Sequence, residues 1–313
     1  ALLIFKIVII SLLGVSHMNY TNALQTSSDL LINISHSKRQ GYYTMPSHHY
    51  HEHYEIYYLI SGERNYFIKD KIYSIKKGDL VLIYKNDIHK TIDSKIPHHE
   101  RLLIDFKEEF LNICPEEEKQ YLLRCFETDR PIIRLDEADQ VFVENLIKEM
   151  LREQSLKESG YFISLKTYLI QLLIFINRLI EQRDELSVDI DANNTIHERI
   201  SEIVQYINRH YDKPLRLTKI ADIFYISPYY LSRLFKEVTG FNFVEYLNLV
   251  RIREAQKLLK NSNAKIIEIA QAVGFKNVAH FGRVFKKITS LSPSSYRKHK
   301  AINHLSAPNS LRK

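Results

Sequence analysis

A histidine-rich stretch, HHYHEHYEIYYLISG, holds side chains of the kinds that bind transition metals. His49 and His51 are separated by one residue, Glu55 follows shortly after, and His89 stands further along the chain. Three imidazoles and one carboxylate are a common ligand set for Fe, Mn, Ni or Zn. These four residues therefore form a candidate site for a divalent metal.

The same side chains also suit a ligand site without metal. Imidazole and carboxylate groups hydrogen-bond polar ligands, and tyrosine rings nearby can stack on a sugar. A third interpretation is that these groups only close the mouth of a barrel. The candidate effector-binding residues are His49, His51, Glu55, Tyr57, Tyr84 and His89. The sequence has no P-loop, GxGxxG or GxSxG motif, so we expect no catalytic residues and no cofactor apart from the candidate metal.

A short basic and aromatic stretch occurs twice in the chain. SPYYLSRLFKEVTG, at 227–240, is matched by VAHFGRVFKKITS at 278–290. Just before each, IADIFYI aligns with IAQAVGF at an offset of 49 residues, and beyond the turn the offset becomes 50. At the second offset the identical pairs are Arg233 and Arg283, Phe235 and Phe285, Lys236 and Lys286, Thr239 and Thr289, and Tyr246 and Tyr296. Each copy predicts a helix, a tight turn, a second helix and an aromatic anchor.

The second helix of each copy separates a core face from an outward face. In the first copy the core face recurs at i, i+3, i+4 and i+7 and consists of Leu231, Leu234, Phe235 and Val238. Ser227 can cap this helix, with Pro228 in the first turn, where a missing N–H costs nothing. The outward residues are the candidate DNA-binding residues: Tyr229, Ser232, Arg233 and Lys236 in the first copy, and Asn277, Ala279, His280, Arg283 and Lys286 in the second.

Two short helices joined by a tight turn make a helix-turn-helix, whose second helix enters the major groove of DNA. Arginine binds guanine bidentately, and tyrosine, serine and asparagine hydrogen-bond bases or phosphates. Charge agrees with a polyanionic partner: residues 197–300 contain 19 Lys+Arg and 8 Asp+Glu, or 19 − 8 = +11, whereas residues 1–196 carry −6 of the total of +7. The alternative is a two-unit helical repeat that binds protein or nothing.

One amphipathic stretch connects the two copies. FVEYLNLVRIREAQKLLK has 18 residues. A helix of this length spans about 27 Å, which is close to the roughly 34 Å of one turn of B-DNA. We expect this helix to hold both reading helices against successive major-groove segments on one side of the duplex.

The histidines must be positioned by strands. Residues 40–106 consist of short β-branched and aromatic runs separated by turn residues, which is typical of a small antiparallel barrel or a jelly roll. From about Glu108 the period becomes helical, with helices predicted over 137–154 and 164–183. The second of these is apolar around much of its circumference. Either the barrel alone or a second copy of the chain must cover it, and we favour the second copy.

The chain divides into six segments. Residues 185–196 are polar and without period, which predicts a linker. Residues 1–17 are apolar, too short for a membrane span and not preceded by a basic leader, so we expect a non-native leader, with a membrane anchor as the alternative. The predicted segments are 1–17 (leader), 18–110 (effector-binding barrel), 111–184 (helical dimerisation region), 185–196 (linker), 197–300 (DNA-binding domain) and 301–313 (tail).

Composition fits a soluble protein of the reducing cytosol. Hydrophobic residues make up 45% and charged residues 26% of 313, enough for two domains with a core each. The two cysteines, Cys114 and Cys125, are expected to be unpaired.

Residues 197–300 resemble the AraC/XylS transcription regulators. IADIFYISPYYLSRLFKEVTGFNFVEYLNLVRIREAQKLL and IAQAVGFKNVAHFGRVFKKITSLSPSSYR carry the resemblance. It implies a seven-helix DNA-binding domain and transcriptional control, usually activation, with base contacts at Tyr229, Ser232, Arg233, Asn277, Ala279, His280 and Arg283. Three positions depart from the family pattern: Tyr225 stands where Gly is frequent, Arg216 where a capping Ser is common, and Ser290 where Gly usually closes the second reading helix.

The barrel is similar to the cupins. His49-x-His51-x3-Glu55-x6-Gly62 has the spacing of the first cupin motif, and Gly78-x10-His89 resembles the second. The resemblances together imply an α+β protein: an N-terminal cupin-like β-barrel followed by helices, then an all-α C-terminal domain with two helix-turn-helix motifs joined by a long helix.

We therefore expect a cytoplasmic transcription regulator, not an enzyme. It would bind double-stranded promoter DNA as a homodimer, respond to a small-molecule effector such as a sugar, contact RNA polymerase, and not associate with a membrane. The alternatives are a metal-dependent cupin enzyme with an appended DNA-binding domain, and a membrane-tethered regulator.

Overall fold

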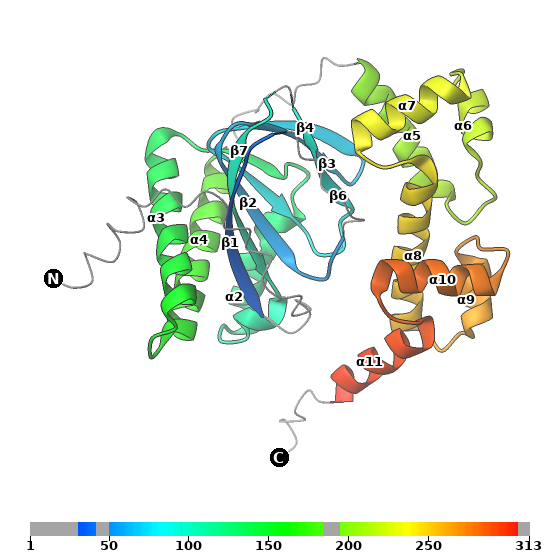
Figure 1. The fold of residues 1–313 in the computed structure, drawn as a ribbon. Helices are drawn as coiled ribbons and strands as arrows, with labels where there is room; N and C mark the ends of the chain where they lie inside the picture. Colours follow the sequence, from blue (N-terminus) through cyan, green and yellow to red (C-terminus); the bar gives the residue numbers. More distant parts are fainter. Residues whose placement is uncertain (1–30, 42–49, 95, 184–194, 306–313) are drawn as a thin grey trace. The chain divides into compact units, whose positions relative to one another are not determined.

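The computed structural model describes residues 31–41, 50–94, 96–183 and 195–305. The leader at 1–17, His49 and most of the predicted linker lie outside these described residues. A β-rich part comes first and a helical part follows, as Figure 1 shows, so the α+β fold class is confirmed.

In the part of the chain that the structure describes, eight strands form two antiparallel sheets. The five-stranded sheet has the order β1-β7-β2-β5-β8, and the three-stranded sheet has the order β4-β3-β6. The strands are β1 (Ile32–Arg39), β2 (Tyr54–Ser61), β3 (Glu63–Ile68), β4 (Lys71–Lys76), β5 (Asp79–Ile83), β6 (His89–Asp93), β7 (His99–Phe106) and β8 (Ile132–Arg134). Successive side chains of a strand point to opposite faces, so each strand gives one row to the barrel interior and one to the outside.

The interior of the barrel is an apolar cluster that contains two tyrosines. Its buried members are Tyr57, Leu59, Tyr66, Ile68, Ile75, Val81 and Ile83. The alternate residues of β2 face outward, where the hydroxyl of Tyr58 donates to Glu144 at 2.9 Å. The odd-numbered residues of β2 from Glu55 to Leu59 therefore face the interior, and so do their register partners on β7 and, through β7, those on β1.

Helices cover the outer face of the five-stranded sheet. They are η1 (Glu108–Leu111), α2 (Glu116–Leu123), η2 (Arg124–Glu127), α3 (Glu137–Leu156) and α4 (Tyr161–Arg183). Gln154 of α3 hydrogen-bonds both the N–H and the carbonyl of Ile34, at 2.8 and 2.7 Å. The edge strand β1 is thereby protected from pairing with another chain at this point.

Helix α4 is long and apolar enough, over Tyr161–Gln182, to cross a membrane by length and composition alone. One face of it is nevertheless core, because Leu169, Leu172 and Leu173 are fully buried. The buried amide of Asn177 donates to the carbonyls of Leu122 on α2 and Leu173 on α4, at 3.1 and 2.9 Å. This packing is that of a core helix.

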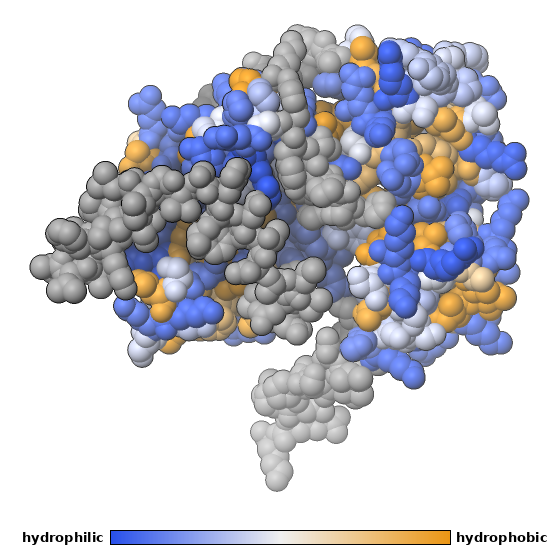
Figure 2. Space-filling view, viewed as in Figure 1, coloured by the Kyte–Doolittle hydropathy of each residue, from blue (hydrophilic) through white to orange (hydrophobic). Residues whose placement is uncertain are grey.

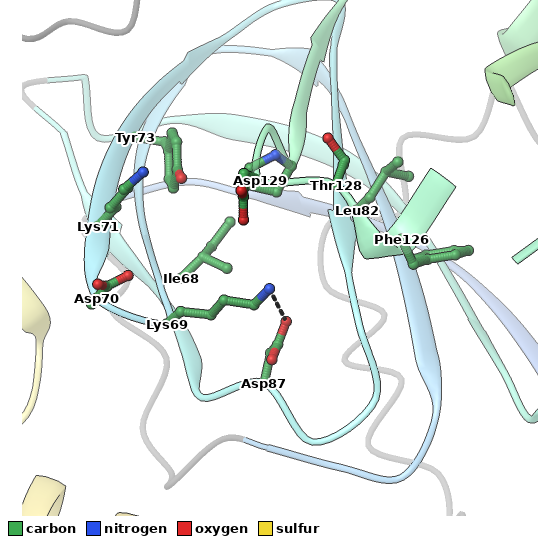
Figure 3. A pocket seen from close by; sticks show the side chains of 11 residues that line it. Ile68, Lys69, Asp70, Lys71, Tyr73, Leu82, Asp87, Phe126, Thr128 and Asp129 are labelled. Carbon is green, nitrogen blue, oxygen red and sulfur yellow. Dashed lines mark ion pairs between the residues drawn. The ribbon is translucent and has the colours of Figure 1, made fainter. Parts of the chain in front are cut away.

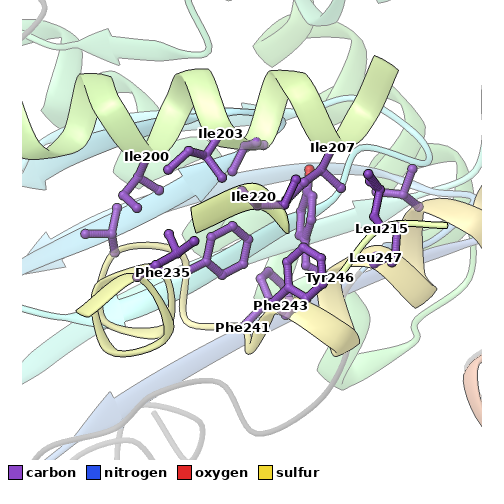
Figure 4. Close-up of a cluster of buried hydrophobic side chains, with 14 of the residues drawn as sticks. Ile200, Ile203, Ile207, Leu215, Ile220, Phe235, Phe241, Phe243, Tyr246 and Leu247 are labelled. Carbon is purple, nitrogen blue, oxygen red and sulfur yellow. The ribbon is translucent and has the colours of Figure 1, made fainter. Parts of the chain in front are cut away.

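Over the described residues 195–305 the C-terminal part forms seven helices, the number that the family resemblance implies. They are α5 (Thr195–His210), α6 (Leu217–Ile223), α7 (Pro228–Thr239), α8 (Phe243–Asn261), α9 (Ile266–Ala272), α10 (Val278–Thr289) and α11 (Pro293–Leu305). Figure 4 shows the core of the first helix-turn-helix, in which Phe235, Phe243 and Tyr246 meet Ile203 and Ile207 of α5. A second cluster, built on Phe281, Phe285 and Tyr296, stabilises the second unit.

The unusual turn residues take the backbone geometry that their positions require. Tyr225 has φ 52° and Ser290 has φ 63°, both in the left-handed region that favours glycine. Arg216 provides no side-chain cap for α6. At the turn that corresponds to Tyr225, Gly274 has φ 88°. The departures from the family pattern are therefore accommodated without loss of the helices.

Three strands did not follow from the sequence patterns. Strand β1 begins at Ile32, before the predicted start at residue 40, and β6 contains His89 itself. Strand β8 lies inside the segment predicted to be helical and pairs with β5. Both cysteines are unpaired, as expected.

The surface has the usual mixture of residue types. On the face that Figure 2 displays, hydrophilic side chains predominate and hydrophobic ones gather in small groups. Scattered apolar residues of this kind are normal for a soluble protein.

Candidate functional site

The first reading helix, α7, presents a row of polar side chains to solvent. The Ser227 hydroxyl accepts a hydrogen bond from the Tyr230 N–H at 3.3 Å and caps the helix, as predicted. Leu231 and Phe235 are fully buried, while Tyr229 is 81% exposed. Ser232, Arg233 and Lys236 are exposed beside it. All four candidate DNA-binding residues of the first copy therefore lie on one accessible face.

Arg233 is partly ordered by its own helix. Its guanidinium lies 5.7 Å from the centre of the Tyr230 ring, which is cation–π distance. Stacking of this kind restricts the side chain while its N–H groups stay available for a bidentate contact with a base.

The second reading helix, α10, is arranged in the same way. Phe281 and Phe285 are buried, and Ala279, His280, Arg283 and Lys286 are exposed. Asn277 is the N-cap, and its side-chain oxygen accepts from the His280 N–H at 2.9 Å. That oxygen already accepts one hydrogen bond within the fold, so the amide N–H₂ is the less constrained polar group of the Asn277 side chain. The sequence pattern had not distinguished this capping role.

Helix α8 joins the two units and contributes to both cores. It has 19 residues, against the 18 predicted, and a capping box formed by Asn242 and Glu245 fixes its start. Tyr246 lies in the cluster of the first unit and Ile252 in that of the second. The two reading helices are thus packed on one continuous rod.

In the barrel, His51, Glu55 and His89 come together. Their ligand atoms all lie within 4.8 Å of one another. The Glu55 carboxylate is 3.1 Å from His51 Nε2 and 3.5 Å from His89 Nε2. Tyr66 donates its hydroxyl to the other Glu55 oxygen at 2.8 Å. Three of the four predicted metal ligands therefore converge; the fourth, His49, lies outside the described residues.

The charges in this cluster stabilise each other. Burial alone would raise the pKa of Glu55, but hydrogen bonds and charge from His51 and His89 hold that pKa well below its usual value. Burial alone would lower the pKa of His51, but the hydrogen bond and charge of Glu55 raise it. Glu55 is thus an anion ready to bind a cation or a hydroxyl donor.

A second carboxylate stands beside Glu55. Asp105 on β7 is the register partner of Glu55 on β2, and both face the interior. Burial, followed by the negative charge of Glu55, raises the pKa of Asp105 to about 7. Asp105 was not among the residues predicted from the sequence, although its position within RLLIDF, four residues after Arg101, places both on one face of a strand.

The two candidate tyrosines are separated. Tyr57 lies inside the barrel, edge to face with Tyr66 at 5.4 Å between ring centres. Tyr84 instead packs on Tyr54, also at 5.4 Å, and Tyr54 stacks on Phe106. Tyr54 and Glu55 are adjacent on β2 and face opposite ways, so the Tyr84 ring contacts the outward side of the strand.

The donors present fit a divalent transition metal. Imidazole nitrogens and a carboxylate bind Zn²⁺ at about 2.0–2.2 Å, so donors around one ion lie close together. His51, Glu55 and His89 already approach this spacing. His51 Nδ1 lies 3.1 Å from the carbonyl of His53, an outer contact that would orient the ring toward an ion.

A separate small hollow lies elsewhere on the barrel. Figure 3 shows Lys69 pointing toward Asp87, with Nζ 3.4 Å from the carboxylate, and Asp129 and Tyr73 around the same space. Its volume is about 40 Å³, room for a water or two, and no predicted effector-binding residue lines it.

Two family descriptions match the chain. An AraC-like ligand binding domain covers residues 35–173, and a helix-turn-helix domain covers residues 220–299.

Named relatives include transcription regulators. The uncharacterized HTH-type transcriptional regulator YijO of Escherichia coli (strain K12) is 39% identical over 126 residues, which is 40% of this chain and 44% of the relative. The HTH-type transcriptional activator RhaR of Mannheimia succiniciproducens is 24% identical over 250 residues, 80% of this chain and 86% of the relative. The matches to the first four curated relatives span only 32–47% of those proteins' lengths.

Solved structures also match. ToxT from Vibrio cholerae O395 has a TM-score of 0.35 and 16% identity, covering 86% of this chain and 97% of that one. The C-terminal domain of AraT from Geobacillus stearothermophilus has a TM-score of 0.33 and 33% identity, covering 34% of this chain and 88% of that one. The two family descriptions fall on the barrel with its helices and on the double helix-turn-helix, in that order. The chain belongs to the AraC/XylS family of DNA-binding transcription regulators, with a ligand-binding domain of the AraC type at its N-terminal side.

Proposed function

We propose that this protein controls transcription by binding promoter DNA through α7 and α10, in response to a small-molecule effector in the barrel. The observation that carries the proposal is the pair of capped helices on one rod, each with an exposed polar face that includes an arginine. Activation through contact with RNA polymerase, in the cytoplasm, is the mode that we propose.

Selection of duplexes from a random pool by the full chain tests DNA binding. Arg233→Ala should weaken binding to the selected duplex by about 1–3 kcal/mol while random duplex is affected much less. Lys236→Ala should weaken both and flatten the salt dependence. Arg130→Ala, an exposed arginine in the loop before β8, is the matched control and should change neither. If Arg233→Ala lost the same affinity for the selected and the random duplex, Arg233 would be a phosphate contact. If the full chain selected no sequence from the pool, the proposal would be refuted.

We propose that α3 and α4 form a homodimer interface. Val141, Leu156 and Ile163 remain 60%, 50% and 63% exposed on these helices. A hollow of about 540 Å³ between α2 and α4 is lined by Ile113, Ile170 and Ile174 among others. Sedimentation of the full chain should show a dimer that Ile163→Asp converts to monomer, whereas a wild-type monomer at micromolar concentration would exclude it.

A divalent metal at His51, Glu55 and His89 is the second part of the proposal for the barrel. After its metal has been removed with a chelator, the full chain should take up one equivalent of Zn²⁺ or Mn²⁺. The variants His51→Ala and His89→Ala should not take up metal. His98→Ala, an exposed barrel histidine, serves as control. The same cluster favours one alternative function, a metal-dependent cupin enzyme, which turnover of a substrate by the metal-loaded protein would identify.

A further inference from the structure

The interior of the barrel has a second polar region beyond the His51–Glu55–His89 cluster. On β7, Arg101 is the register partner of Ser37 on β1 and of Leu59 on β2. Directly opposite residues in an antiparallel pair share one face, and Leu59 belongs to the interior cluster. Ser37 and Arg101 therefore face inward, next to Tyr57, which is two positions from Leu59 on the same face.

The polar groups of this region are left without internal partners. The Arg101 guanidinium lies over the Tyr57 ring, 5.4 Å from its centre, and it forms no ion pair with a carboxylate in the described part of the chain. The hydroxyls of Tyr57 and Ser37 are buried and have no hydrogen-bond partner among the described residues. Each such buried hydroxyl costs about 1–3 kcal/mol, a cost that a ligand would remove.

The surrounding charge is positive. Arg64 is fully buried nearby and pairs with Asp93 at 2.5 Å, so the Asp93 carboxylate is engaged by Arg64. Burial, and then the positive charges of Arg64 and Arg101, lower the pKa of His99 to about 4, so that this histidine is neutral at pH 7. A cavity of about 210 Å³ opens at this end of the barrel. It is lined by Lys38, Arg39, Gln40, Ser61, His98 and His99.

We propose that this end of the barrel binds the anionic group of the effector, a carboxylate or a phosphate, with Arg101 as its charge partner and the hydroxyls of Tyr57 and Ser37 as donors. Arginine pairs with both anions through two parallel N–H bonds. The interior is then polarised, because Glu55 and Asp105 supply acceptors at the other end for hydroxyl groups or a metal. An anionic sugar derivative has matching groups at both ends. This inference rests on the proposed effector-binding function and specifies its ligand.

The first test needs no ligand. An arginine kept for binding contributes little to folding, so Arg101→Met and Tyr57→Phe should leave the melting temperature of the full chain unchanged or raise it. Arg130→Met, at an exposed arginine before β8, is the matched control. A clear fall in melting temperature for Arg101→Met would assign Arg101 to the structure of the barrel and overturn the proposal.

The second test uses simple anions at constant ionic strength, inorganic phosphate in one arm and acetate in the other, with chloride as reference. Whichever anion matches should raise the melting temperature of wild type, and its dissociation constant should be at least tenfold weaker in Arg101→Met. No shift with either anion, or an equal shift in both proteins, overturns the proposal. In parallel, Arg101→Met should bind the selected DNA duplex as tightly as wild type does. If wild type itself did not bind that duplex, the proposed DNA-binding function would be contradicted instead.

Discussion

Replacing Tyr225 by glycine should stabilise the protein. Tyr225 lies in the turn between α6 and α7 with φ 52°, where its N–H bonds the carbonyl of Asp222 at 3.3 Å. A residue with a Cβ pays about 1–2 kcal/mol for this conformation. Glycine avoids that cost but loses about 0.5–1 kcal/mol of chain entropy on folding. Because the tyrosine is 92% exposed, little packing is lost, and the expected net gain is about 0.5–1 kcal/mol.

The second helix-turn-helix provides the reverse experiment. Gly274, in the corresponding turn, has φ 88°, and a Cβ there would lie 2.7 Å from the carbonyl oxygen of Asp212 and 2.8 Å from that of Tyr211. Gly274→Ala should therefore destabilise by about 1–3 kcal/mol. Tyr225→Gly removes a Cβ and Gly274→Ala adds one at corresponding positions of the two copies, so the two variants should change stability in opposite directions.

Urea unfolding of the full chain, followed by circular dichroism at a helical wavelength, measures both changes; the chain has no tryptophan to follow instead. Tyr225→Ala is the control, since it keeps a Cβ and should stay within about 0.5 kcal/mol of wild type. If Tyr225→Gly were less stable than Tyr225→Ala, the tyrosine turn would not be strained and the reasoning would be wrong.

Three further outcomes are expected. Burial and nearby arginines lower the pKa of His99 from 6.5 to about 4. As the pH falls, His99 is therefore protonated in the unfolded chain before it is protonated in the folded chain. Stability should therefore fall as pH drops from 6.5 towards 4, by at most about 1.4 kcal/mol per pH unit, and His99→Gln should flatten this slope in acid titrations of unfolding. Asn242→Ala removes the side chain that accepts from the Glu245 N–H at 2.9 Å and should cost about 0.5–2 kcal/mol in urea. Asn177→Ala removes the amide that donates to the Leu122 carbonyl at 3.1 Å, beside the weaker Cys125 thiol at 3.5 Å, and should cost about 1–3 kcal/mol in thermal unfolding.

The DNA-binding helices could be predicted from the sequence because their determinants are local. The apolar spacing of Leu231, Leu234 and Phe235 and the Ser227 cap lie within a few turns of each other, and the duplicated unit gave a second view of the same pattern. The role of Asn277 was missed because an asparagine before a helix serves equally as a cap or as a base-reading side chain.

The barrel was harder because its strands depend on partners far along the chain. Strand β8 has three residues, Ile132–Arg134, too few to show a period, and it exists because β5 offers it a pairing edge. Strand β1 pairs with β7 across some seventy residues of chain, from Ile32 with Phe106 to Arg39 with His99. The histidine and glutamate spacing identified one end of the interior, but nothing local marked Ser37, Tyr57 and Arg101 as neighbours.

Register also explains why Arg101 has no ion-pair partner among the described residues, although a carboxylate stands next to it in sequence. Glu100 points to the outer face of β7, where it binds His36 at 2.8 Å and Lys38 at 3.2 Å. A shift of one residue would bring Glu100 inside and turn Arg101 out. The register between β2 and β7 shifts at this point. Leu59 is opposite Arg101, and Ser61, two residues further along β2, is opposite Glu100. The charge of the barrel interior is thus set by the pairing register, and a positive end survives there because the one adjacent carboxylate is held outside.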